Sequence, residues 1–162
     1  MGAIEVSPSL QYIQNAYYDA RQQGWAKKPV ISMQVPSTQD KSLAPEGGHV
    51  ASLFCQHFQR HLPDGRSWDE VKHEVADMII GTIDNYAPNF KASVVGRQIK
   101  SPLDIERDLN TVGGDIFHGA LHLDQFYSLR PLPGYADYKM PVDGVYLCGS
   151  GAHPGGGVSG LP

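Results

Sequence analysis

The chain has 162 residues, of which 41% are hydrophobic, and its formal net charge is −4. That length allows one sizeable hydrophobic core, and the scattered basic residues exclude the footprint of a nucleic-acid-binding protein. No apolar run is long enough to cross a bilayer, so no transmembrane segment is expected. The N-terminus also lacks the charged start and apolar stretch of a secretory signal.

The first third of the chain predicts one helix and two strands. Ser7-Pro8 is typical of a helix start, and Gly24 is a plausible helix stop. Strands are expected over 30–35 and 50–58, separated by a loop over 37–48 that is rich in Ser, Pro and Gly. The apolar residues at helical spacing in the expected first helix are Leu10, Ile13, Ala16, Tyr17 and Ala20.

The clearest helix follows a turn at Pro63–Gly65. Ser67 and Glu70 form a capping box that begins this helix, and Pro88 ends it. A third strand is predicted over 92–99, and Ser101-Pro102 begins a short helix over 103–109. The core face of the long helix is expected to contain Trp68, Val71, Val75, Met78, Ile79, Ile83 and Tyr86.

The irregular alternation of helices and strands favours an α+β fold, with a mixed sheet and helices packed on one face. Residues 1–143 are expected to form one domain. Residues 144–162 are expected to follow as a separate C-terminal segment, in which 145–148 predict a buried strand. A glycine-rich stretch over 149–160 comes directly after that strand.

Glycine has a physical meaning in this last stretch. Without a Cβ, the backbone can take positive φ and lie directly against a flat or phosphorylated ligand. A strand that runs into a glycine loop before a helix also directs unpaired N–H groups toward an anion. The stretch therefore predicts a ligand-binding loop. A nucleoside-triphosphate site is disfavoured, because no Gly-Lys-Ser/Thr sequence closes the loop.

Several segments of the chain carry a resemblance to a known family. The sequence Gly-Ser-Gly-Ala-His-Pro-Gly-Gly-Gly at 149–157 resembles the C-terminal flavin-binding motif of the phytoene-desaturase-like FAD-dependent oxidoreductases. The similarity continues through Gly-Gly-Asp-Ile-Phe-His at 113–118, through 123–125 and through 129–138. It is dense over 87–158 and looser before that.

The resemblance implies that the chain is the C-terminal part of an FAD-dependent oxidoreductase, with 1–143 as its substrate-side domain. Family members hold FAD mainly through an N-terminal strand–Gly-x-Gly-x-x-Gly–helix unit, which this sequence lacks. That Rossmann domain is therefore expected as a missing partner in the same protein, and the fragment alone is expected to be inactive. FAD would accept a hydride or its equivalent from a C–H bond of an apolar substrate. The animal branch of the family further implies the mitochondrial matrix.

The alternative to an enzyme is a non-catalytic interaction or regulatory protein built on a flavoprotein scaffold. It would apply if Met1 were the true start of the protein, because the cofactor domain would then be absent.

The resemblance places FAD beside the glycine loop. The backbone of the three consecutive glycines is expected to lie against the flavin. Ser150 stands where many related flavoproteins carry an acidic residue, and a serine hydroxyl would bond the cofactor more weakly than a charged group. The residues expected to bind the cofactor are Gly149, Ser150, Gly151, His153, Gly155, Gly156, Gly157 and Val158.

His153 and His118 are the candidates for proton transfer, since imidazole titrates near neutral pH. His153 lies inside the loop before Pro154, which restricts its backbone. A structural role, with the ring bonded to the loop backbone, is an open alternative. His118 follows a glycine pair that allows a tight turn, and Asp115 is placed to orient it; the alternative is a turn with a buried Phe117.

Arg130 and four aromatic residues have further expected roles. Arg130 is a candidate to pair with a carboxylate across a domain interface. The aromatic residues would either wall an apolar cavity or pack as ordinary core. They are Phe126, Tyr127, Tyr135 and Tyr138.

No metal site is predicted, although the chain has seven histidines. The pairs at 57 and 61 and at 118 and 122 have a suitable spacing, but a third ligand and a supporting shell are not evident. Cys55 and Cys148 form no Cys-x-x-Cys motif, so no dithiol relay for electrons is expected. Such sparse cysteine fits a reducing, intracellular compartment, and Cys148 is expected to be a small buried hydrophobic residue.

Overall fold

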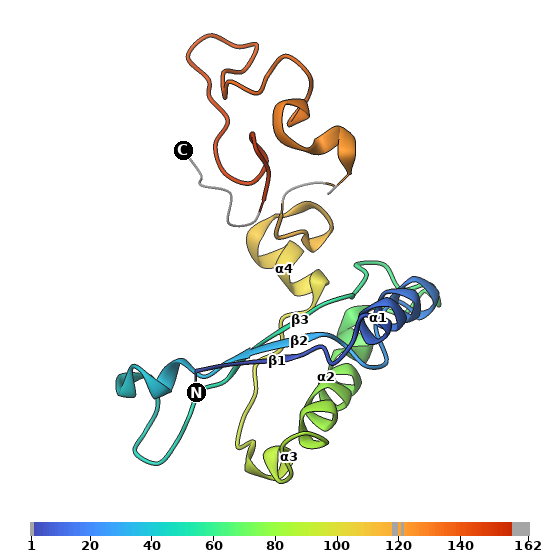
Figure 1. Cartoon of the computed structure of the whole chain (residues 1–162), viewed down its shortest axis with the longest axis vertical. Helices are drawn as coiled ribbons and strands as arrows, with labels where there is room; N and C mark the ends of the chain where they lie inside the picture. Colours follow the sequence, from blue (N-terminus) through green and yellow to red (C-terminus); the bar gives the residue numbers. More distant parts are fainter. Residues whose placement is uncertain (1, 118–119, 121, 157–162) are drawn as a thin grey trace. The chain divides into compact units, whose positions relative to one another are not determined.

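The computed structural model describes residues 2–117, 120 and 122–156, and the chain divides into two compact units (Figure 1). Unit 1 ends at Leu103, and unit 2 begins at Asp104. Unit 1 holds a small sheet and its helices, whereas unit 2 consists mainly of turns and loops. Together these elements confirm an α+β fold. The division at 143 and 144 expected from the sequence stays a prediction.

Three strands form the sheet in the order β1-β2-β3, and both neighbouring pairs are antiparallel (Figure 1). The strands are β1 (Ala3–Val6), β2 (Ile31–Gln34) and β3 (Ser52–Cys55). The expectation of a mixed sheet was therefore wrong, and β1 was not predicted at all. The strands expected over 30–35 and 50–58 exist, but each has only four residues.

Helix α1 (Leu10–Gln23) begins and ends through local backbone chemistry. Ser9 caps it, since the Tyr12 N–H donates to Ser9 Oγ at 3.1 Å, so the cap lies two residues beyond the expected Ser7. Gly24 takes a φ of 98°, which confirms the predicted stop. The expected apolar face is only partly buried, because Ala16 and Ala20 are buried while Leu10 and Tyr17 are exposed.

Helix α2 (Trp68–Asp84) confirms the predicted capping box. The Ser67 N–H donates to Glu70 Oε2 at 2.6 Å, and the Asp69 N–H donates to Ser67 Oγ at 3.2 Å. Tyr86 was wrongly assigned to the core face, because it lies beyond the helix end and is exposed. The buried residues of the helix are Trp68, Val71, Val75, Ile80, Thr82 and Ile83.

The strand predicted over 92–99 is absent from the described part of the chain. Residues Phe90–Ser93 form the short helix α3, and 94–100 follow without regular structure. The next helix, α4 (Pro102–Leu109), matches the prediction within one residue.

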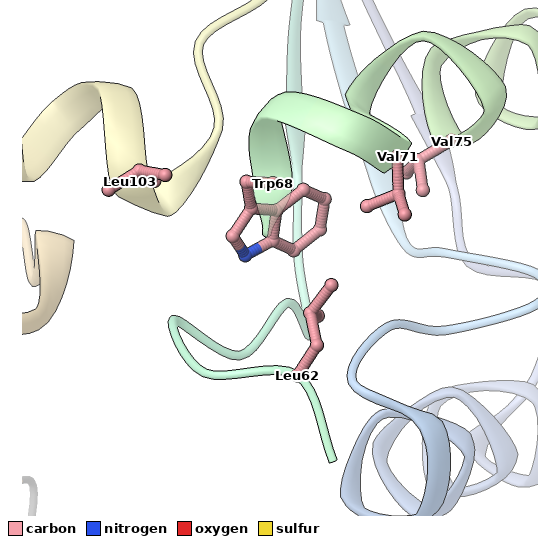
Figure 2. Packing of buried hydrophobic residues seen from close by; sticks show 5 residues of the cluster. All are labelled: Leu62, Trp68, Val71, Val75 and Leu103. Atoms are coloured by element: carbon pink, nitrogen blue, oxygen red, sulfur yellow. The ribbon is translucent and has the colours of Figure 1, made fainter. Parts of the chain in front are cut away.

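Two hydrophobic clusters hold unit 1 together. Cluster 1 joins the loop before α2, α2 itself and the start of α4; Figure 2 shows its buried members, Leu62, Trp68, Val71, Val75 and Leu103. Cluster 2 packs α2 against one face of the sheet through Val6, Ile31, Met33 and Ile83. Ile79 packs against both clusters. The expectation that a helix covers one sheet face is thus confirmed for α2.

Candidate functional site: the glycine loop around Arg130

A narrow hairpin precedes the glycine loop in unit 2. Lys139 and Tyr146 form an antiparallel bridge, and the Leu147 N–H donates to the Tyr138 carbonyl at 2.8 Å. The predicted buried strand over 145–148 exists only as one side of this bridge. Tyr146 and Cys148 are exposed.

Two expectations from the sequence were therefore wrong: 145–148 is not a buried strand, and Cys148 is not a buried hydrophobic residue. The apolar run did not become a core strand because a strand is buried only where other elements cover both of its faces. The described residues of unit 2 form a single bridge here rather than a sheet.

The loop after the hairpin begins with a tight turn. Gly149 has a φ of 89°, and the Ala152 N–H donates to the Gly149 carbonyl at 3.0 Å. Ala152 is buried, with 2% of its surface exposed. A Cβ built on Gly149 would meet no atom within 4 Å, so the chain leaves open space on this side of the loop.

Arg130 lies at the centre of the loop and is 1% exposed. Its guanidinium donates to three backbone carbonyls that come from different parts of unit 2. Nε donates to the Gln125 carbonyl at 2.7 Å, and one terminal nitrogen donates to the Ser150 carbonyl at 3.0 Å. The other terminal nitrogen donates to the Ala120 carbonyl at 2.6 Å. From the sequence, Arg130 was a candidate to pair with a carboxylate across a domain interface. These three acceptors are instead backbone carbonyls of the unit to which Arg130 itself belongs.

The far end of the loop rests on the same arginine. Gly155 is buried and has a φ of 120°, and a Cβ there would lie 3.4 Å from Arg130 Nε. The Tyr127 N–H donates to the Pro154 carbonyl at 3.3 Å, which ties the loop to the segment that carries Arg130. Arg130 therefore contacts the loop at both ends.

His153 lies between these two ends. Its Nδ1 is buried and has no hydrogen-bond partner among the described residues. The ring packs edge-on to Tyr138, with 6.3 Å between the ring centroids. The structural alternative, a ring bonded to the loop backbone, is thus not met at Nδ1. A polar atom of a bound group would satisfy this nitrogen.

Gly156 has a side chain of the same chain beside it on its Cβ side. A Cβ on Gly156 would lie 2.7 Å from Cδ1 of Phe117, so this protein's own side chain fills that space. The Phe117 N–H donates to Asp115 Oδ1 at 2.8 Å. Gly113 and Gly114 have φ values of 69° and 66°, which confirms the predicted tight turn.

Three predicted site residues, His118, Gly157 and Val158, lie outside the described residues. Of the others, the structure brings the span from Gly149 to Gly156 together as one loop on Arg130. The aromatic residues do not form a common wall, since Tyr127 is 70% exposed. Ser150 takes part through its carbonyl group, whereas the sequence had drawn attention to its hydroxyl.

The residues present fit a cofactor at one part of the loop only. Gly149, with positive φ and open space beside it, and His153, with an unsatisfied ring nitrogen, are suited to a polar ligand such as a flavin group. Gly156 is unsuited on its Cβ side, where Phe117 already lies. The resemblance implied the same role for all these glycines, whereas in the structure Gly149 has open space beside it and Gly156 has Phe117 beside it.

Other parts of the described chain offer less to a ligand. An open pocket of about 280 Å³ in unit 1 is lined in part by Asp77, Lys91 and Arg97, and it contains none of the predicted site residues. The described residues include no group of three or more potential metal-ligating His, Cys, Asp or Glu side chains. Within the same residues, no helix is both long enough and apolar enough to span a bilayer.

The chain is similar in sequence to several known proteins. No protein-family model matches it. It is 50% identical over 149 residues to pyridine nucleotide-disulfide oxidoreductase domain-containing protein 2 of Rattus norvegicus, covering 91% of this chain and 26% of that protein. The Mus musculus protein of the same name is 49% identical with the same coverage. Phytoene desaturase (lycopene-forming) of Pantoea ananas is 27% identical over 140 residues, covering 85% of this chain and 27% of that protein.

The chain therefore spans about a quarter of the length of the curated relatives it matches. The resemblance is confirmed: over 149 residues this chain is similar to pyridine nucleotide-disulfide oxidoreductase domain-containing protein 2 and, at lower identity, over 140 residues, to a phytoene desaturase.

Proposed function

We propose that the chain is the C-terminal part of an FAD-dependent oxidoreductase that dehydrogenates an apolar substrate. The observation that carries this proposal is the 50% identity over 149 residues to a protein named for its oxidoreductase domain. The desaturase name of the more distant relative supports removal of hydrogen from an apolar molecule. The remaining three quarters of the relatives' length leaves room for a Rossmann domain that would hold most of the cofactor.

In this proposal the glycine loop lies against FAD at Gly149 and His153, and bound FAD supplies the hydride-accepting chemistry. Gly149 allows close approach of the backbone, because it has positive φ and open space beside it. His153 offers its unsatisfied Nδ1 to a polar atom of the cofactor. Arg130 holds the Ser150 carbonyl through a hydrogen bond of 3.0 Å.

Gly149 and Gly134 form a matched pair for testing this site in the full-length protein. They have φ values of 89° and 90°, and a Cβ on either would meet no atom of the chain within 4 Å. Alanine therefore introduces the same backbone strain at both positions. We expect Gly149→Ala to weaken FAD binding at least tenfold, which is about 1.4 kcal/mol, and Gly134→Ala to change it less than twofold.

The readouts are the flavin absorption near 450 nm after gel filtration and titration of the apoprotein with FAD, with circular dichroism as the check on folding. Equal FAD affinities for the two variants would show that Gly149 does not contact the cofactor, and would contradict the proposed site. Full-length protein without flavin and without affinity for FAD would contradict the enzyme proposal. The non-catalytic scaffold protein would then be favoured.

The dehydrogenation itself is tested by anaerobic mixing of the flavin-loaded protein with apolar hydrocarbons of different length. Bleaching of the flavin band by one of them supports an oxidoreductase with an apolar substrate, whereas bleaching by polar substrates alone contradicts the apolar class.

We also propose the mitochondrial matrix as the compartment, on the resemblance alone. Fluorescence microscopy of the tagged full-length protein, with a matrix marker, tests this compartment.

A further inference from the structure

The guanidinium of Arg130 joins three separate stretches of unit 2. Its three nitrogens donate to the carbonyls of Ala120, Gln125 and Ser150, at distances between 2.6 and 3.0 Å. Only 1% of the residue is exposed, so these bonds are made away from bulk water. A hydrogen bond from a charged donor is stronger than a neutral one, and breaking it in a buried place leaves a carbonyl unsatisfied.

We infer that Arg130 is the positioning residue of the glycine loop: it fixes the loop in its binding conformation before a ligand arrives. The inference deepens the proposed function and rests on it where FAD affinity is concerned. Neither the relatives nor the sequence pattern assigned this role, because all three acceptors are backbone carbonyls.

The loop is held at its beginning by the Arg130 side chain and at its end by the segment that carries Arg130. At the beginning, the Ser150 carbonyl accepts from Arg130. At the end, Gly155 lies against the Arg130 side chain, and the Pro154 carbonyl accepts from the Tyr127 N–H, three residues before Arg130. Residues 151–153, with the His153 ring, lie between these two ties, so we infer that their position depends on Arg130 and its segment.

A loop that is already ordered loses less conformational freedom on binding. Each flexible residue that must be fixed by a ligand costs free energy, and preorganisation removes that cost from the binding step. Gly149, Gly151 and Gly155 would otherwise make this loop the most flexible kind of backbone. The arginine therefore offsets the flexibility that the glycines introduce.

The planar fork of arginine is essential to this role. The three guanidinium nitrogens lie in one plane and reach three acceptors in different directions. A lysine has a single compact ammonium group at the end of a flexible chain. Arg130→Lys keeps the positive charge but does not reproduce the three bonds. A role that needed only a buried cation would be rescued by lysine, and a positioning role would not.

The test uses the full-length protein with Arg130→Lys and Arg130→Ala, and with Arg97→Lys as a control on an arginine paired with Asp77 in unit 1. Hydrogen exchange in the apoprotein measures loop order without reference to FAD. We expect the Ala152 amide, which donates to Gly149, to exchange at least tenfold faster in both Arg130 variants than in the wild type or Arg97→Lys.

The second readout is FAD titration, in which both Arg130 variants should bind at least tenfold more weakly. Ethylguanidinium should restore the affinity of Arg130→Ala, and ethylammonium should not. If the wild type does not bind FAD, the proposed function fails, while loop exchange still decides the role of Arg130. If the wild type binds FAD and lysine preserves both exchange and affinity, the positioning role is overturned.

A wild-type measurement decides the case in which neither variant folds. The Ala152 and Tyr127 amides of the wild-type apoprotein should exchange much more slowly than an unstructured peptide. Exchange at the unstructured rate in a folded apoprotein would show that the loop is not ordered before binding, and the inference would be wrong.

Discussion

The ring of Phe117 fills the space beside Gly156, where a Cβ would lie 2.7 Å from Phe117 Cδ1 and 3.3 Å from Phe117 Cβ. The absence of a side chain at Gly156 is therefore explained by packing within unit 2. A loss of cofactor binding on substitution of this glycine would not by itself locate the cofactor.

We expect Gly156→Ala to destabilise the chain by about 1–3 kcal/mol, because an extra methyl group is forced into an occupied space. Phe117→Leu opens that space, so the double variant should recover part of the loss. Thermal unfolding of the two single variants and the double variant gives the coupling energy. Strictly additive losses would mean that the two side chains do not compete for one space.

Gly24 and Gly81 are expected to respond in opposite directions to alanine. Gly24 has a φ of 98°, and a Cβ there would lie 2.6 Å from Leu62 Cδ2, so Gly24→Ala should cost about 1–3 kcal/mol. Gly81 lies inside α2 with open space around it, so Gly81→Ala should stabilise by about 0.5–1 kcal/mol. Urea unfolding followed by Trp fluorescence measures both. Destabilisation by Gly81→Ala would contradict the open space described there.

The two cysteines should differ strongly in reactivity. Burial raises the pKa of Cys55 to about 12, while Cys148 is exposed. Since the thiolate is the reacting form, we expect alkylation at pH 8 to modify Cys148 at least tenfold faster than Cys55. Mass spectrometry of the wild type, with Cys55→Ser and Cys148→Ser as controls, measures each rate. Equal rates would show that Cys55 is more accessible than its packing in cluster 2 indicates.

The raised pKa of Cys55 also has a consequence at alkaline pH. The folded state favours the neutral thiol, so this contribution to stability is complete below pH 9 and is lost as pH rises toward 12. Cys55→Ala should flatten that loss in unfolding experiments.

In the full-length protein, replacing both cysteines by alanine should leave flavin reduction intact, because no dithiol relay is expected. Loss of reduction in a folded, flavin-loaded variant would require a thiol step.

His57 predicts a change of stability at mildly acidic pH. Burial lowers the pKa of His57 below its usual 6.5, so the unfolded chain takes up the proton more readily than the folded chain. The contribution to stability is complete above pH 6.5 and is lost as pH falls through the lowered pKa. His57→Asn removes the titration, and asparagine tolerates the φ of 71° at this position.

The measurement for His57 is the free energy of unfolding in urea between pH 7.5 and pH 5. We expect a shallower decline for His57→Asn than for the wild type over that range. A constant offset between the two proteins at every pH would reflect lost packing with Tyr17, whose ring lies 6.0 Å from that of His57. Parallel curves would therefore contradict a lowered pKa.

Local signals in the sequence predicted the elements whose ends are set by neighbouring residues. Ser67 with Glu70, and Gly24, act within one helical turn, so their effects are visible in the sequence. The segment 92–99 failed because strand formation depends on a partner strand, and its β-forming residues carry no information about whether one is present. The four-residue strand β1 was missed because it is too short to show a reliable pattern.

The candidate site was predictable only as a loop. The glycines indicated where the backbone could turn, and the family resemblance gave them a ligand. The role of Arg130 was out of reach, because its acceptors at 120, 125 and 150 are carbonyls that every residue carries. The different surroundings of Gly149 and Gly156 were equally hidden, since they depend on where Phe117 packs.

Ile79 packs against both hydrophobic clusters of unit 1, one built around Trp68 and the other around the sheet. Loosening one cluster therefore withdraws support from the other, and neither can melt alone without exposing this shared side chain. We expect unit 1 to unfold in a single cooperative transition. Shortening the side chain of Ile79 should separate this transition into two steps. The fluorescence of Trp68 would then no longer follow the loss of strand structure.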